Sequence, residues 1–186
     1  MERMLFVLIA AAGGTPVTMS FSEVVPAMQR GVIDCAITGS NSGNNAKWND
    51  VATHLFPITL GWGVNFIVAN ADRWDGLDPE VRAFLEQEIE TKLEPAGWEM
   101  ARIATDQGIW CSVGDDRCVP ESTAPRNLTK ADMTLVDLSD ADRETLKILV
   151  AEHVMAEFTA ACGADCVQRW NETVGTVVDI ELEAAQ

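Results

Sequence analysis

Residues 13–39 read GGTPVTMSFSEVVPAMQRGVIDCAITG, and this stretch decides the fold. The short run 15–19 follows two glycines and is rich in β-forming residues, which predicts a strand. Ser20 and Glu23 have the spacing of a capping box, which predicts the start of a helix. A glycine ends that helix, and the apolar run 32–38 predicts a second strand. The stretch therefore predicts a strand–helix–strand unit.

The composition excludes several classes of protein. With 186 residues, 47% of them hydrophobic and 23% charged, the chain is long enough to bury one core. Its net charge of −16 argues against binding nucleic acid or an anionic membrane surface, because both need clustered lysine and arginine. No stretch approaches the roughly 20 apolar residues of a membrane-spanning helix, so we expect no direct membrane insertion. We also expect no cofactor, since no phosphate-binding glycine loop is present.

The cysteines indicate an oxidising compartment. Cys111 and Cys118 enclose six residues, and Cys162 and Cys166 enclose three, so two local disulfides are predicted. The alternative is a four-thiolate zinc site, although only the second pair has a spacing typical of a zinc knuckle. Cys35 lies in an apolar run, where we expect a small buried thiol.

The rest of the chain reads as a mixture of helices and strands without an internal linker. Asp78 and Pro79 predict the start of a long helix that runs to about residue 110 and bends at Pro95. Ser139 predicts the start of another helix. The remaining expectations are a polar loop at 40–45, a helical turn at 47–54, two strand segments within 55–70, a loop at 112–131, a strand at 133–138 and a last helix at 164–174.

The sequence carries no catalytic signature. The two histidines, His54 and His153, stand outside every hydrolase, metalloprotease or cysteine–histidine motif, so we expect a non-enzymatic protein and no metal site. A hydrolytic or transferase domain is kept as a further hypothesis, ranked below the two functions given at the end of this section.

Polar side chains gather at two predicted strand ends, where ligands bind in open α/β sheets. Thr38, Ser40 and Asn41 follow one strand, and Trp62 and Asn65 belong to the next apolar run. Their hydroxyl and amide groups can donate to and accept from a carboxylate or polyol, and the indole offers a flat apolar face. A loop of turn-forming residues beside a core tryptophan would give the same pattern.

The run 13–39 closely resembles the middle of the DctP-type solute-binding receptors of TRAP transporters, which have "G-x-T-P-V-x-M-x-F-S-E-V-x-x-A-M-Q-x-G-V-I-D" at this place. The resemblance extends over roughly residues 1–175. It implies an α/β fold of the two-lobe type II periplasmic-binding-protein class, here incomplete, with a mixed sheet, the bent helix at about 79–110 and carboxy-terminal helices. Residues 1–186 would then form a single partial domain.

The resemblance also implies a function. The family delivers small organic acids to TRAP membrane permease subunits from the periplasm. By position, Thr38, Ser40 and Asn41 match its polar ligand contacts, Trp62 and Asn65 match its aromatic wall, and Glu23 matches a position near the cleft. The alternative is a cysteine- or zinc-stabilised interaction module without a role in transport.

Two expectations concern the amino-terminal end. In the family an amphipathic helix precedes the opening motif, and residues 1–12 match that helix, although a short signal peptide is the other interpretation. The family also places a carboxylate-binding arginine on a strand upstream of this helix. We find no equivalent of that strand, so we expect the amino-terminal part of the fold to be missing and ligand binding to be impaired.

Overall fold

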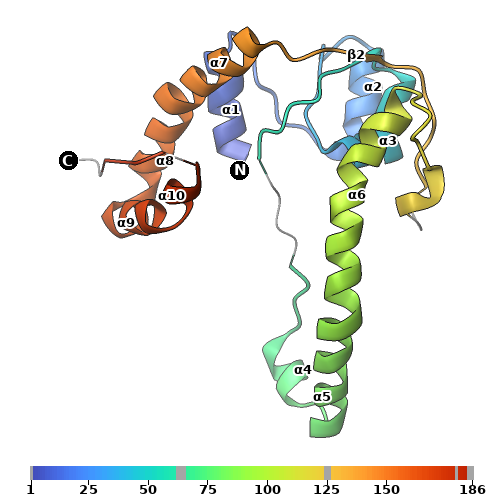
Figure 1. Cartoon of the computed structure of the whole chain (residues 1–186), viewed down its shortest axis with the longest axis vertical. Coiled ribbons are helices and arrows are strands. Elements are labelled where there is room, and N and C mark those ends of the chain that lie inside the picture. Colours follow the sequence, from blue (N-terminus) through green and yellow to red (C-terminus); the bar gives the residue numbers. More distant parts are fainter. Residues whose placement is uncertain (1, 62–65, 124–126, 179, 184–186) are drawn as a thin grey trace. The chain divides into compact units, whose positions relative to one another are not determined.

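The computed structural model describes residues 2–61, 66–123, 127–178 and 180–183. Helices dominate these residues (Figure 1). Among them, two short strands, β1 (His54–Leu55) and β2 (Thr134–Leu135), form a parallel pair in which His54 faces Thr134 and Leu55 faces Leu135. The chain is thus a helix-rich α/β protein. The two-lobe architecture stays a prediction.

The chain divides into two compact units. The first unit comprises residues 1–19 and 138–186, and the second comprises residues 20–137. That residues 1–186 form one partial binding-protein domain stays a prediction. The first unit contains α1 (Glu2–Ala11), α7 (Asp140–Leu149), the π-helical turn η5 (Val150–Val154), α8 (Met155–Cys162), α9 (Ala164–Glu172) and α10 (Val174–Val178).

Helix α1 confirms that the amino-terminal segment is helical. It packs along η5 and α8, buries Leu8 and pairs Arg3 with Glu157. The predicted cap of the next helix is also confirmed, because the Ser139 hydroxyl accepts from the backbone N–H of Asp142 at 3.1 Å and the Asp142 carboxylate accepts in return. The first unit is therefore an assembly of helices whose starts are readable from the sequence.

The second unit is built around one long helix. It contains η1 (Phe21–Glu23), α2 (Val24–Gln29), α3 (Ser40–Asn45), η2 (Trp48–Asp50), β1, α4 (Ala71–Asp75), α5 (Pro79–Glu88), the π-helical turn η3 (Ile89–Leu93), α6 (Glu94–Ser112), η4 (Pro120–Thr123) and β2. Figure 1 shows α5 and α6 as parts of the same continuous helix.

The start and the bend of this helix follow the sequence prediction. The Asp78 carboxylate accepts from the Glu80 backbone N–H at 2.8 Å, and Pro79 occupies the first helical position, where no backbone donor is lost. Pro95 cannot donate within the helix, and the chain passes from α5 to α6 through the wider π-helical turn η3 just before it. The helix then continues to Ser112, two residues beyond the predicted end.

The predicted strands are mostly wrong. Residues 15–19 and 32–38 form no strand, and within 55–70 and 133–138 the described residues pair only at Leu55 and at residues 134–135. Strand formation needs backbone partners on a neighbouring strand, and β-forming side chains alone do not supply them. In the part of the chain that is described, these apolar runs have no such neighbour.

The predicted capping box at Ser20 is also wrong in detail. The Ser20 hydroxyl donates to the Glu23 carboxylate at 2.7 Å, so the two side chains bond to each other rather than to the backbone. A 3-10 turn, η1, therefore precedes α2. Gly31, with φ of 67°, ends that helix as predicted, because its N–H donates to the Met28 carbonyl.

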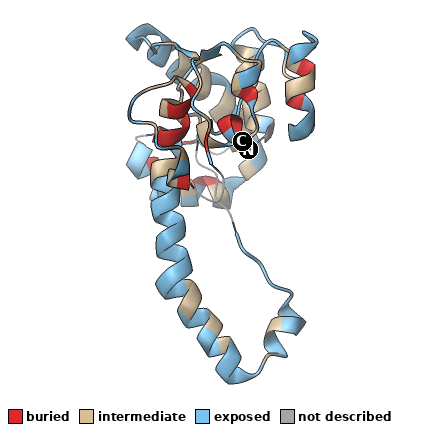
Figure 2. Ribbon diagram, turned by 90° about the vertical axis from the view of Figure 1, so that its right-hand side faces the viewer, coloured by how far each residue is buried: buried red, intermediate tan, exposed pale blue. Residues whose placement is uncertain are grey.

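Residues 40–45 form helix α3 instead of the predicted loop, and a close contact with α6 explains why. A Cβ atom at Gly108 would lie 2.3 Å from the backbone nitrogen of Asn41 and 2.5 Å from the carbonyl carbon of Ser40. Only glycine permits this approach. Packing on α6 thus overrides the weak helix propensity of a run of serine, glycine and asparagine. Figure 2 shows buried residues gathering where α3 meets this end of α6, whereas α5 and the first part of α6 are exposed.

Both predicted cysteine pairs stand at disulfide distance. Cys111 and Cys118 join the end of α6 to the following loop, and Cys162 and Cys166 join α8 to α9. All four sulfurs are used in these pairs, so the four-thiolate zinc module is not favoured. The expectation of a buried Cys35 is wrong: its thiol is free and exposed, because residues 32–38 do not enter a sheet.

The contact at Gly108 generates a matched pair of substitutions. We expect Gly108→Ala to lower the free energy of unfolding by about 1–3 kcal/mol, because the added methyl group overlaps the α3 backbone. Gly97→Ala, on the same helix with no atom within 4 Å of the new Cβ, should raise that free energy by about 0.5–1 kcal/mol through helix propensity. Urea unfolding followed by circular dichroism measures both. Equal effects of the two substitutions would contradict the close approach.

The cysteine arrangement is tested by alkylation. We expect iodoacetamide to modify only Cys35 in the unreduced, urea-unfolded protein, and all five cysteines after reduction. Peptide mass spectrometry should recover the 111–118 and 162–166 links. Modification of all five thiols before reduction would count against both disulfides.

Candidate functional site

Three of the predicted ligand residues come together at the start of α3. Thr38 is exposed, while Ser40 and Asn41 are half-buried. The Ser40 hydroxyl donates to the Thr105 carbonyl of α6 at 2.7 Å, so part of its hydrogen-bonding capacity is already used by the fold. Segment 38–41 is thus anchored on α6, with the Thr38 side chain at its surface.

Asn41 differs from Ser40 in having an unused donor. Its Nδ2 atom is buried and has no hydrogen-bond partner among the described residues. A buried amide donor that stays unpaired costs free energy comparable to a lost hydrogen bond. Asn41 is therefore the side chain of this segment with the largest gain to make from an added acceptor.

The other predicted ligand residues are not brought to this place by a described contact. Glu23 is exposed on η1, and its carboxylate bonds to Ser20. Trp62 and Asn65 lie outside the described residues.

A buried asparagine one turn along α3 was missed by the sequence interpretation. Asn44 is only 2% exposed, and its amide bonds to the Ser112 hydroxyl and to both backbone groups of Thr129. Nothing in the run SNSGNN distinguishes Asn44 from its exposed neighbour Asn45, because a polar run predicts exposure for every member. Only the packing of α3 reveals it.

Trp48 was missed as well. It is buried, it packs on Phe21 with ring centroids 5.2 Å apart, and its ring lies 3.5 Å from the place that a Cβ at Gly43 would occupy. The Thr38 methyl group lies 3.2 Å from the same place. Trp48 and Thr38 therefore flank the glycine of α3. The Trp48 Nε1 atom is buried and is unpaired among the residues described.

Charged side chains follow α3 and α6 in the chain. Lys47 follows α3 with φ of 63°, and its ammonium group donates to the Thr129 hydroxyl. After α6, the Arg117 guanidinium stacks on Trp110 at 4.7 Å and bonds to Asp115 at 2.9 and 2.7 Å. These side-chain bonds from Arg117 hold the pKa of Asp115 well below its usual range.

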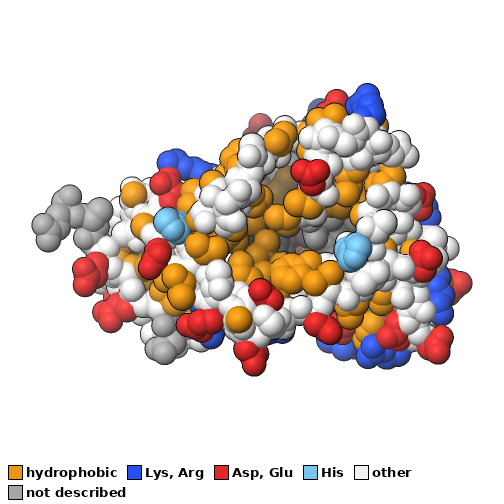
Figure 3. All heavy atoms as spheres, turned by 90° about the horizontal axis from the view of Figure 1, so that it is seen from above, with side chains coloured by type: hydrophobic (Ala, Val, Ile, Leu, Met, Phe, Trp, Pro, Cys, Tyr) orange, Lys and Arg blue, Asp and Glu red, His pale blue; other side chains and the backbone are white. Residues whose placement is uncertain are grey.

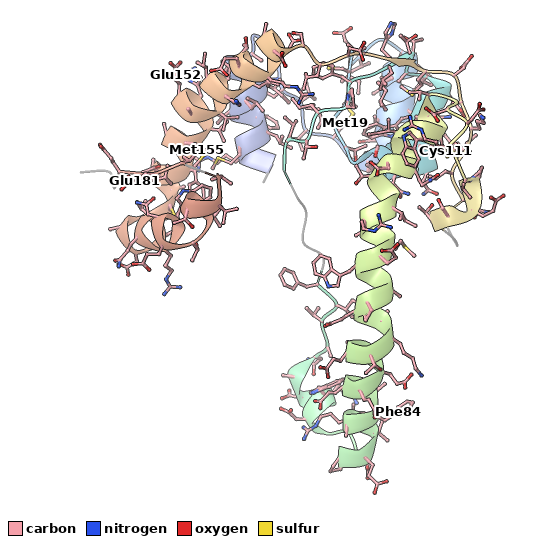
Figure 4. All side chains as sticks on the ribbon, in the orientation of Figure 1. Met19, Phe84, Cys111, Glu152, Met155 and Glu181 are labelled. Carbon is pink, nitrogen blue, oxygen red and sulfur yellow. A yellow bond between two sulfur atoms is a disulfide. The ribbon has the colours of Figure 1, made fainter. Side chains whose placement is uncertain are left out.

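The disulfide loop is fixed to α6 near the site. Figure 4 places Cys111 on α6, far along the helix from Phe84 on α5. Beside Cys111, the buried Gln107 side chain donates to the Arg117 carbonyl at 3.2 Å and accepts from the Val119 N–H at 2.7 Å. The end of α6 therefore holds the loop by one covalent link and two hydrogen bonds.

Acidic side chains are scattered over the face drawn in Figure 3. Across the described ranges, no three histidine, cysteine or carboxylate side chains are placed to hold a metal ion together. No helix in the same ranges has both the length and the apolar character needed to cross a bilayer.

Comparison with known proteins gives a family. The family model of the bacterial extracellular solute-binding proteins of family 7, DctP, matches residues 2–102. A stretch of 77 residues is 35% identical to the C4-dicarboxylate-binding periplasmic protein DctP of Rhodobacter capsulatus, and covers 41% of this chain and 23% of that protein. No solved structure was found to match.

The family match includes the whole of the opening motif, helix α3 and the first part of α6. All six predicted ligand residues lie inside it, and both cysteine pairs lie beyond it. Because the match spans more than half of the chain, the chain belongs to family 7 of the bacterial extracellular solute-binding proteins, the DctP family.

Proposed function

We propose that this chain is a solute-binding component of a TRAP-type transporter, that it binds a small organic acid through carboxylate groups, and that it passes this ligand to the membrane permease subunits without chemical change. The observation that carries the proposal is the DctP family match over residues 2–102, which contains all six predicted ligand residues. By the same argument its place of action is the periplasm.

The ligand class is supported by the chemistry of segment 38–41 and by the relative from Rhodobacter capsulatus, whose name gives C4-dicarboxylates as its ligands. Thr38 and Asn41 offer a hydroxyl and an amide donor, and both suit a carboxylate oxygen. Trp62 and Asn65 would add an apolar face and a further donor, and Glu23 would stand near the ligand. Each of these contacts is part of the proposal.

Titration calorimetry with succinate tests the function. We expect saturable heat with succinate and none with succinamide, which keeps the carbon skeleton but has no charge. Asn41→Ala should weaken succinate binding by about 10- to 100-fold, the effect of losing a hydrogen bond to a charged ligand. Asn45→Ala, at an exposed position on the same helix, should leave the affinity unchanged.

Two results would overturn the proposal. One is an equal response to succinate and succinamide, which would remove the carboxylate from the recognition. The other is the absence of any response to succinate at millimolar concentration from a protein that circular dichroism shows to be folded, while the relative from Rhodobacter capsulatus binds under the same conditions.

A further inference from the structure

The amide of Asn44 is paired in the way that two strands pair. Its Oδ1 accepts from the Thr129 N–H at 2.7 Å, and its Nδ2 donates to the Thr129 carbonyl at 2.8 Å. The same Nδ2 also donates to the Ser112 hydroxyl at 3.0 Å. With 2% of the residue exposed, these three bonds are shielded from water, and each lost bond would leave a buried polar group unpaired.

Ser112 and the neighbours of Thr129 in the chain have hydrogen bonds that do not involve Asn44. Ser112 is the last residue of α6, and its carbonyl accepts from the Met133 N–H at 3.0 Å. Beside it, the Cys111 carbonyl accepts from the Ala131 N–H at 2.8 Å. The disulfide from Cys111 fixes the loop that leads toward Thr129. Asn44 therefore attaches α3 to segments that are also held by other bonds.

Helix α3 is too short to hold its own orientation. A helix of six residues is far below the length at which helices persist alone in water. It is attached to α6 at its start, through the contact with Gly108 and the bond from Ser40 to Thr105. Its end is attached through the three buried bonds of Asn44 and, just beyond the helix, through the exposed bond from Lys47 to the Thr129 hydroxyl. Without the Asn44 bonds, we expect α3 to pivot about its start.

We propose that Asn44 is a positioning residue for ligand binding: it contacts no ligand, and it fixes the direction of α3 so that Thr38 and Asn41 present their donors in one geometry. The ligand part of this inference rests on the proposed function. The hold on α3 rests on the three hydrogen bonds alone, so the two parts can be tested separately.

A matched pair of serine substitutions makes the test. Ser112→Ala removes one of the two groups that accept from the Asn44 Nδ2 atom, and so one of the three hydrogen bonds of this amide. Ser122→Ala removes a hydroxyl that is also buried but has no partner among the described residues, so it is the control. Asn44→Ala removes all three bonds. If that variant does not fold, the comparison of Ser112→Ala with Ser122→Ala still tests whether the Asn44 bonds position α3.

Two measurements are made on each variant, under conditions in which circular dichroism shows all of them to be folded. The first is amide hydrogen exchange of residues 40–46, compared with exchange in α7 and α9. The second is the affinity for succinate. We expect about fivefold faster exchange in α3 and a several-fold weaker affinity for Ser112→Ala, larger effects for Asn44→Ala, and none for Ser122→Ala.

The outcomes separate the two parts of the inference. Faster exchange confined to α3 together with weaker succinate binding supports both. Faster exchange with unchanged affinity overturns the role in ligand binding. Exchange that is unchanged, or equally faster in the control, overturns the hold on α3. If the unsubstituted protein fails to bind succinate, the proposed function falls, and the exchange rates alone decide whether Asn44 positions α3.

Discussion

The packing of α3 on α6 in the second unit depends on Gly108 having no side chain. The backbone of α3 lies so close to α6 at this point that even a methyl group would overlap two of its atoms. The approach places the Ser40 hydroxyl in reach of the Thr105 carbonyl and brings Asn44 to Ser112 and Thr129. The candidate ligand residues of segment 38–41 are carried on this contact. A close backbone contact that only glycine permits thus fixes the position of the polar side chains on segment 38–41.

The sequence predicts features that depend on neighbours along the chain. The caps at Asp78 and Ser139, the long helix through Pro95, the amino-terminal helix and the pairing of nearby cysteines all depend on residues that are close in the sequence, and the structure contains them. The family follows from one continuous motif for the same reason. Such features need no knowledge of the tertiary fold.

The features that fail depend on partners far away in the sequence. The runs 15–19 and 32–38 have the composition of strands, but a strand forms only where a neighbouring backbone segment pairs with it. In the described ranges no segment pairs with either run. The loop predicted at 40–45 is wrong for the opposite reason. Packing on α6 stabilises a helix there that its own residues do not favour. Within the candidate site the sequence singled out Thr38, Ser40 and Asn41 by residue type, but Asn44 and Trp48 became visible only through their burial. The ligand roles of all six predicted residues remain predictions.

The asparagine pairing seen at Asn44 occurs a second time, in the first unit. The Asn171 amide donates to the Leu182 carbonyl at 2.8 Å and accepts from its N–H at 2.9 Å. In both units one side-chain amide thus pairs with the N–H and C=O groups of an irregular segment, as a strand backbone would, and attaches that segment to a helix. In a chain with so few paired strands in its described part, this pairing is one way in which extended segments obtain backbone partners.

The exposed thiol of Cys35 has a practical consequence. It stands three residues before Thr38, and the other four cysteines are joined in pairs. An environment-sensitive fluorophore attached there would sit beside segment 38–41 without any engineered residue. The protein therefore carries its own attachment point for an optical reporter, through which solute occupancy could be followed in real time and many candidate organic acids compared on one labelled sample.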